Sequence, residues 1–208
     1  MENVCDFTSA KTWKDIYERV ISDPRYLNNI LYGKPRPGHA EGSVKAHIEE
    51  LQDILEYLNH RYSFPEEIYW KLCVLVHVHD SFKADAKRDS PILDPQNHAS
   101  LAKKFLAEFT DDEDMLNIVQ FHDLGFAVYR KYKTTGRFDE AKLMHGLNSI
   151  QDLDLFLWFV IIDTGTASKG REGVTWFVNK VNELLPDKTF VTAKFILPGE
   201  AVIDGNVW

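Results

Sequence analysis

His79 and Asp80 stand side by side at the end of a nearly unbroken apolar run that begins at Leu72. Placing a carboxylate among valine and leucine side chains costs several kcal/mol unless a cation or a hydrogen-bond partner compensates it. Imidazole and carboxylate are also ligands that divalent transition metals accept readily. We therefore expect a metal ion at this pair, with further ligands elsewhere in the chain.

Further residues of metal-binding type fall on the apolar faces of expected helices. A single histidine on such a face is more often a hydrogen-bonded core residue than a ligand, and Asp163 alone is equally well explained as a hydrogen-bonded helix end. The joint pattern outweighs these explanations, because facing helices of a bundle build metal sites from inward-pointing side chains. The candidate metal ligands are His47, His79, Asp80, His98, His122 and Asp163.

Helical periodicity covers most of the chain and must position these residues. Apolar residues recur at helical spacing and predict helices over residues 13–21, 44–60, 65–79, 98–109, 111–122, 139–149, 152–163 and 172–185. The helix that ends at His79 is apolar on opposite faces, so we expect it to be central and buried on most sides. Thr110 and Glu113 have the spacing of a capping box at the start of the helix expected over residues 111–122.

The segments between these helices are expected to be loops. Residues 81–96 contain two prolines and form a long loop of the kind that is often functional. A basic segment with Gly125 and Gly136 is interpreted as the connection to the helix at 139–149. The fold class is therefore all-α, a single domain over residues 1–208 with five or more core helices. Its tail, residues 189–208, alternates weakly and is expected to form a short extended piece that covers the domain.

The order His, His-Asp, Asp resembles the HD superfamily of metal-dependent phosphohydrolases, with His47, His79-Asp80 and Asp163 in the signature positions. The stretch that leads into His47 resembles the first-histidine helix of that family, and Lys83 matches a lysine often found three residues after the pair. The resemblance covers about residues 39–165. It implies an all-helical domain around a divalent metal.

His98 and His122 resemble the additional histidines of family members that hold a second metal. In those members the aspartate of the pair, here Asp80, bridges both ions. The alternative is one metal with His98 and His122 facing the substrate or supporting other ligands. Ser81-Phe82 replace the small, Gly-containing turn usual after the pair, which leaves the subfamily and the substrate open. The cofactor is therefore one or two divalent ions of Mn, Fe, Co, Ni, Zn or Mg.

The chemistry that the resemblance implies is hydrolysis of a phosphate ester by a metal-activated water. Asp80 and Lys83 are the candidate catalytic residues. Basic residues near the ligands are candidates for holding the phosphate: Lys83, Arg130, Lys133 and Lys169. Tyr129 and Tyr132 could stack on a base. His39, in the glycine-rich loop before His47, could reach the site. Asp123, beside His122, could support a ligand or accept a proton, but the sequence favours a polar residue at a helix end.

The composition of this chain of 208 residues restricts the kinds of partner that it can bind. Its formal net charge of −8 argues against binding long nucleic acid, which relies on an excess of Lys and Arg. The N-terminal residues lack the pattern of a signal peptide, and no apolar run could span a bilayer. Cys5 and Cys73 are expected to be free thiols in a reducing cytoplasm. The expected partner is a small phosphorylated substrate such as a nucleotide, and a homodimer is compatible with the sequence.

Two other functions remain open from the sequence alone. The same order of ligands resembles the members of the superfamily that use a di-iron centre to activate oxygen and oxidise a C–H bond. A non-catalytic domain that binds a nucleotide without turnover is the third alternative. A closed structural zinc site is disfavoured, because such sites use four ligands and are rich in cysteine.

Overall fold

Two helices that are apolar on every side form the centre of the computed structural model, which describes residues 12–35, 42–166 and 169–196. In α4 (Glu66–Val78), every residue from Leu72 to Val76 is buried. In α9 (Leu153–Asp163), every residue before the terminal aspartate is buried except Asp154. A helix without a polar face needs neighbours all around it. The predicted central position of the helix ending at His79 is therefore confirmed.

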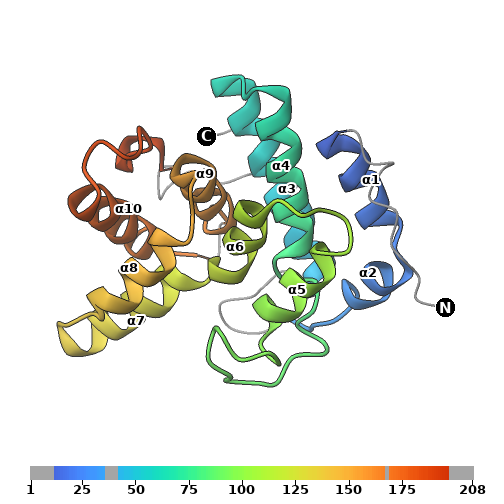
Figure 1. Ribbon diagram of the computed structural model, residues 1–208, viewed down its shortest axis with the longest axis horizontal. Helices are drawn as coiled ribbons and strands as arrows, with labels where there is room; N and C mark the ends of the chain where they lie inside the picture. The colour runs from blue at the N-terminus through green and yellow to red at the C-terminus, as the bar shows by residue number, and fades with distance from the viewer. Residues whose placement is uncertain (1–11, 36–41, 167–168, 197–208) are drawn as a thin grey trace.

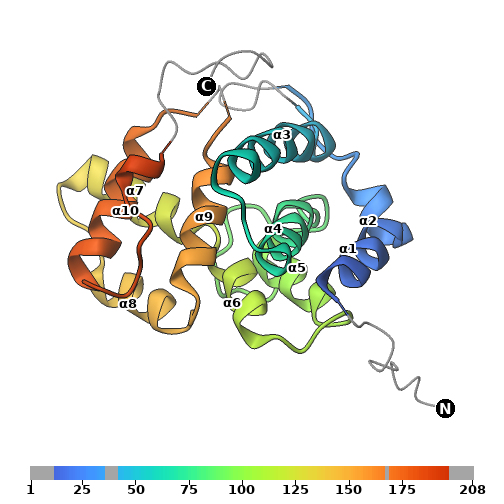
Figure 2. The same ribbon diagram turned by 90° about the horizontal axis from the view of Figure 1, so that it is seen from above.

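The remaining helices surround this pair (Figure 1). They are α1 (Trp13–Ser22), α2 (Pro24–Asn29), α3 (Val44–Tyr62), α5 (His98–Leu106), α6 (Glu113–Phe121), α7 (Leu124–Thr135), α8 (Glu140–Asn148), α10 (Glu172–Leu184) and the short 3₁₀ turn η2 (Ala193–Phe195). Helix α4 packs against α1, α3, α6 and α9, while α7 packs against α10. Seen from above, α1 and α2 flank the centre on one side and α7, α8 and α10 on the other (Figure 2). The all-α prediction is confirmed for the described residues.

Polar side chains fix where the site-bearing helices begin. Ser43 accepts a hydrogen bond from Ala46 N at the start of α3, and Asn97 does the same for Ala99 N at the start of α5. At the start of α6 the capping residue is Asp112, whose carboxylate accepts from two backbone amides. The predicted capping box starting at Thr110 is wrong, because Thr110 instead accepts from Asp112 N in the preceding turn.

Two short or basic segments are helical although their sequence did not predict it. Helix α2 begins at Pro24, a residue that suits the first turn of a helix as well as the end of the preceding one. Helix α7 contains the segment interpreted as a connection. Gly136, with φ of 68°, ends it in the left-handed conformation that glycine adopts without strain.

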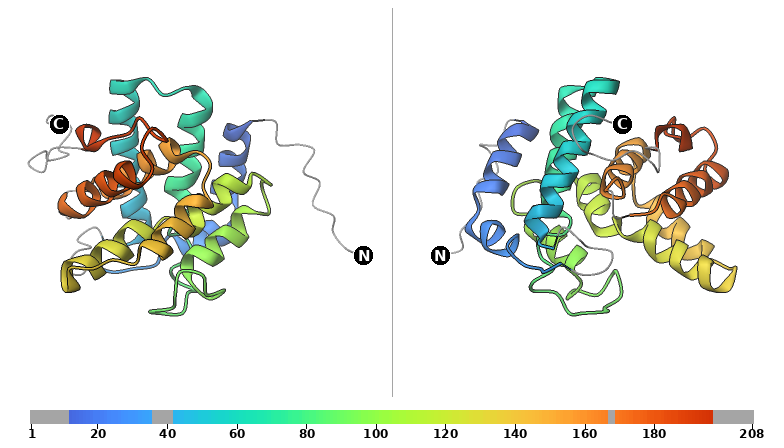
Figure 3. Two further views of the ribbon diagram at one scale, coloured as in Figure 1. Left: turned by 60° about the vertical axis from the view of Figure 1, so that its left-hand side comes forward. Right: turned by 180° about the vertical axis from the view of Figure 1, so that it is seen from behind.

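The long loop between α4 and α5 is confirmed and lies at one end of the molecule, toward which α7 and α8 also extend (Figure 3). The described part of the tail, residues 189–196, includes η2, and Phe195 packs on Tyr62 and Trp158. The tail therefore covers the C-terminal end of α3, away from His47. No described helix is long and apolar enough to cross a membrane. Cys73 is a buried free cysteine, whereas Cys5 lies outside the described residues.

Candidate metal centre

Four of the predicted ligands meet at one point, which we call group A: His47, His79, Asp80 and Asp163. His47 Nε2 lies 3.1 Å from Asp163 Oδ1. His79 Nε2 lies 3.4 Å from Asp80 Oδ2 and 3.6 Å from Asp163 Oδ1. Ligand atoms of His47, His79 and Asp80 all lie within 4.8 Å of one another, close enough to share one ion. The structure thus brings together residues 116 positions apart in the chain.

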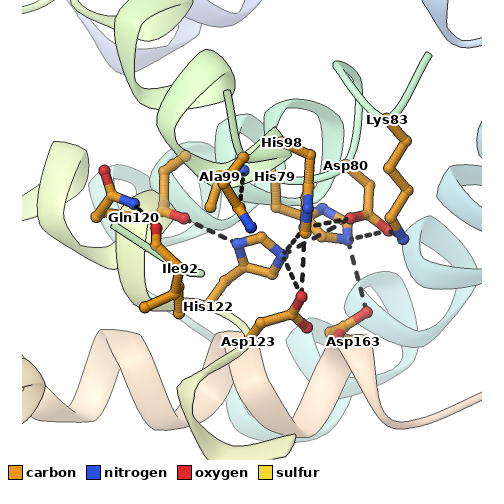
Figure 4. A network of polar contacts seen from close by, with 12 residues as sticks. His79, Asp80, Lys83, Ile92, His98, Ala99, Gln120, His122, Asp123 and Asp163 are labelled. Atoms are coloured by element: carbon orange, nitrogen blue, oxygen red, sulfur yellow. Dashed lines mark hydrogen bonds and ion pairs between the residues drawn. The ribbon is translucent and has the colours of Figure 1, made fainter. Parts of the chain in front are cut away.

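The other two histidines form group B with the same aspartate: Asp80, His98 and His122. Asp80 Oδ1 lies 3.5 Å from His98 Nε2 and 3.6 Å from His122 Nε2 (Figure 4). The two histidine Nε2 atoms are 3.1 Å apart. The ligand atoms of this group also fall within 4.8 Å of one another. Asp80 therefore directs one carboxylate oxygen toward each group.

All six side chains stand at or near the ends of helices. His47 lies in the first turn of α3 and His98 is the first residue of α5. His79-Asp80 follow the last residue of α4, His122 follows α6, and Asp163 ends α9. A carboxylate at a helix C-terminus is opposed by the helix dipole, so Asp163 is not placed there for the stability of α9. Its position is better explained by the groups it faces.

Two histidines are oriented with an acceptor nitrogen toward the centre. His122 Nδ1 lies 2.8 Å from Val119 O, and His79 Nδ1 lies 3.0 Å from Val76 O. Each Nδ1 donates to its carbonyl, so that Nε2, once it has lost any proton, offers its lone pair to a cation. His79 Nε2 is buried and has no hydrogen-bond partner among the described residues. A buried, unpartnered imidazole nitrogen aimed at two carboxylates fits a divalent metal.

Asp123 is a further acid at this centre whose role the sequence left undecided. Asp123 Oδ2 lies 3.3 Å from His98 Nε2 and 3.8 Å from His122 Nε2. It occupies the N-cap position of α7 but makes no capping hydrogen bond with its side chain. Asp123 thus lies at a helix end, but its carboxylate faces the two histidines and does not cap α7. Although burial opposes it, the charge of His122 and the hydrogen bond from His98 lower the pKa of Asp123 to about 2.

The charges of the centre favour a cation. Lys83 forms an ion pair with Asp80, and Lys169 Nζ lies 3.0 Å from Asp163 Oδ1. Burial would raise the pKa of Asp80 and of Asp163, but these lysines and the neighbouring histidines hold both well below the usual range. With Asp123, three carboxylates face two ammonium groups. Protonated His79 balances the third carboxylate in the metal-free protein, and a divalent ion that displaces this proton would take over that balance.

A cavity of about 590 Å³ opens on group B, and we call it the basic cavity. His98, Asp123 and Lys83 line it on the side of the metal centre. Four further cations line the remainder: Lys87, Arg88, Arg130 and Lys142. The predicted substrate-binding residues Lys83 and Arg130 thus share one cavity.

A second cavity, of about 600 Å³, lies between α7 and α10 and is called the aromatic cavity. Phe126, Tyr129 and Phe177 line it together with His122 and Asp163. Lys133 and Lys169 line it too, but Lys133 is paired with Glu172 and Lys169 with Asp163.

Some residues named from the sequence lie away from both cavities. The Tyr132 ring stacks on Trp176, with 4.9 Å between ring centroids, and does not line either cavity. His77 contacts Tyr17 and Tyr26, and burial followed by the charge of His79 lowers its pKa to about 4. His39 lies outside the described residues.

No family model, no curated protein and no solved structure matches this chain.

Proposed function

We propose that this protein is a metal-dependent hydrolase of phosphate esters that acts on a small phosphorylated metabolite such as a nucleotide. The observation that carries the proposal is the placement of Asp80. Its two carboxylate oxygens face separate histidine groups, and it pairs with Lys83 at the wall of the basic cavity. An acid shared between two ligand groups beside a cluster of cations suits an anionic substrate that must contact metal and lysine together.

A divalent ion, when bound, lowers the pKa of water toward neutrality and neutralises charge on a phosphoryl oxygen. The chain's own residues complete the reaction. Lys83 is placed to donate to a phosphoryl oxygen in the basic cavity. Asp123 lies on the boundary of both cavities, where its carboxylate can accept a hydrogen bond from an attacking water and orient it.

The proposal is tested by a screen of phosphate monoesters and diesters against Mn, Co, Fe, Ni, Zn and Mg, with bound metal measured on the same preparation. Asp80→Asn keeps the shape of the side chain but removes its charge. We expect this variant to lose both bound metal and hydrolysis while its helical circular dichroism is unchanged. Asp111→Asn, at an exposed acid away from both cavities, is the matched control.

The same experiment separates the alternatives. Two irons after aerobic purification, with oxygen consumption on a C–H substrate, would favour the di-iron oxygenase. Tight nucleotide binding without turnover with any metal would favour a non-catalytic domain. Undiminished hydrolysis by Asp80→Asn would exclude the proposed function at this centre.

A further inference from the structure

Five cations line the basic cavity, and among the described residues only Lys83 has an acidic partner, Asp80. Among the described residues, no carboxylate lies within 4.0 Å of the charged groups of Lys87, Arg88, Arg130 or Lys142. Arg130 instead lies over the ring of Phe126, 5.6 Å from its centroid. Asp89 also lines the cavity but forms no ion pair with them. The cavity is therefore a concentration of uncompensated positive charge.

These four cations gather at one hollow in a chain that is acidic as a whole. The formal net charge is −8. Some cations elsewhere pair with acids, as Arg25 does with Asp23 and Glu108, whereas scattered exposed cations such as Lys104 and Arg137 form no ion pair among the described residues. Four like charges directed at one hollow repel one another and concentrate anions there. A bound anion would relieve that repulsion.

The cavity is continuous with the metal centre. His98 of group B lines it, as do Lys83 and Asp123. Its volume of about 590 Å³ is in the range of sites for small molecules. If a phosphoryl group is held beside Lys83, further phosphoryl groups attached to it would therefore extend toward the four cations.

Hydrogen bonds hold the loop that carries Lys87 and Arg88 in place. Asn97 Nδ2 donates to Ser90 O at 2.9 Å, and Lys87 N donates to Gln96 O at 2.8 Å. From α6, Gln120 Nε2 donates to Ile92 O at 2.6 Å. These bonds hold the loop against the helices that carry His98 and His122. The backbone that carries Lys87 and Arg88 is therefore held in place before a ligand binds.

We infer that the basic cavity binds the additional phosphoryl groups of a substrate with two or more phosphates in line, such as a nucleoside diphosphate or triphosphate. The inference rests on the proposed function for the position of the first phosphate. The aromatic cavity, which shares Asp123 and Phe126 with the basic cavity, offers Tyr129 and Phe177 to the organic part. A simple monophosphate would leave the four cations without a partner.

The direct test measures binding of inorganic tripolyphosphate to the metal-free protein by calorimetry. The variant Lys87→Gln/Arg88→Gln/Lys142→Gln removes three charges that make no ion pair in the described structure, so the fold should be retained. We expect its affinity to fall at least about a hundredfold, since each lost charge contact costs about tenfold. Its dependence on salt concentration should also weaken. Lys104→Gln/Arg137→Gln, at exposed cations outside both cavities, should bind as the wild type does.

A kinetic arm keeps this inference separate from the proposed function. With metal restored, the triple variant should raise KM for a nucleoside triphosphate and leave KM for the matching monophosphate unchanged. Tripolyphosphate binding that depends on the three cations, without hydrolysis of any ester, would support the cavity and overturn the proposed function. Hydrolysis with equal tripolyphosphate affinity in the triple variant and wild type would overturn the cavity and leave the proposed function standing.

Discussion

His79 lies between two carboxylates, and these determine whether its imidazole is protonated at neutral pH. Burial alone would lower its pKa, but Asp80 and Asp163 together raise the pKa from 6.5 to about 10. The imidazole of the metal-free protein is therefore protonated at neutral pH, and a bound metal must displace that proton. We expect the apparent metal affinity to rise about tenfold per pH unit between pH 6 and pH 8. Calorimetry in buffers of different ionisation enthalpy would count the proton released.

The raised pKa of His79 also makes the stability of the metal-free protein depend on pH in a defined direction. A pKa raised in the folded state gives stability that is fully present below pH 6.5 and is lost as the pH rises through about 10. Urea unfolding at pH 7 and at pH 10 measures this loss, and His79→Gln should remove it. A metal affinity independent of pH would contradict the protonation of His79.

Asp123 provides a second prediction for a single residue. Asp123→Asn removes the charge next to His98 and His122 without removing a helix cap, because this carboxylate caps nothing. Acids that support histidine ligands contribute about 10- to 100-fold to metal affinity. We expect a loss in this range confined to group B, with the helical circular dichroism unchanged. Metal titration of the variant, beside Asp111→Asn, measures it, and an unchanged affinity would exclude Asp123 from the centre.

At the scale of elements, close packing of α7 on α10 forms one wall of the aromatic cavity. A Cβ at Gly125 would lie 3.0 Å from the ring of Phe177, which is only 1% exposed and cannot move aside. Gly125→Ala gains up to about 1 kcal/mol of helix propensity, but overpacking costs about 1 to 3 kcal/mol. We expect a net loss of stability in urea unfolding. Gly170→Ala, with open space around the added methyl, should change stability by less than about 0.5 kcal/mol.

An unchanged stability in Gly125→Ala would show that the α7–α10 contact is looser than described. The expected loss of stability would instead show that packing on α10 stabilises α7, a helix that the sequence alone did not predict. Gly125 and Gly136 weaken local helix propensity, and the exposed basic residues between them give α7 little apolar face of its own. Contact with α10, which periodicity within one segment cannot show, stabilises it.

Elements with a strong apolar pattern were predictable, and so were their polar interruptions. Periodicity predicted α3, α4 and α9, and the residues that broke it, His47, Asp80 and Asp163, meet in space. The role of Asp123 was not predictable, because an acid at a helix start has an ordinary capping explanation. The one signal against that explanation, the lack of a capping bond, exists only in three dimensions. The basic cavity was not predictable from the sequence either, because its cations come from a loop and two helices.

For the whole molecule, a bound metal should act as a ligand of the folded state alone. The ligands of groups A and B come from segments spread over α3 to α9, and unfolding separates them. At a free metal concentration of about 100 times Kd, binding adds about 2.7 kcal/mol to the free energy of unfolding. For a chain of this size Tm should rise by roughly 5–10 °C. Differential scanning fluorimetry with and without chelator measures the shift.

Asp80→Asn is the control for this measurement, because it removes the one acid common to both groups. Its Tm should be insensitive to metal. A metal-induced rise that persists in Asp80→Asn would place the ion elsewhere on the surface.

The wide separation of the ligands also orders events while the chain is being made. A ribosome releases His47 early, and 116 further positions must follow before Asp163 emerges to face it. Group A is therefore incomplete throughout most of translation. The apolar helices α4 and α9 must pack together before Asp163 can join the other three ligands.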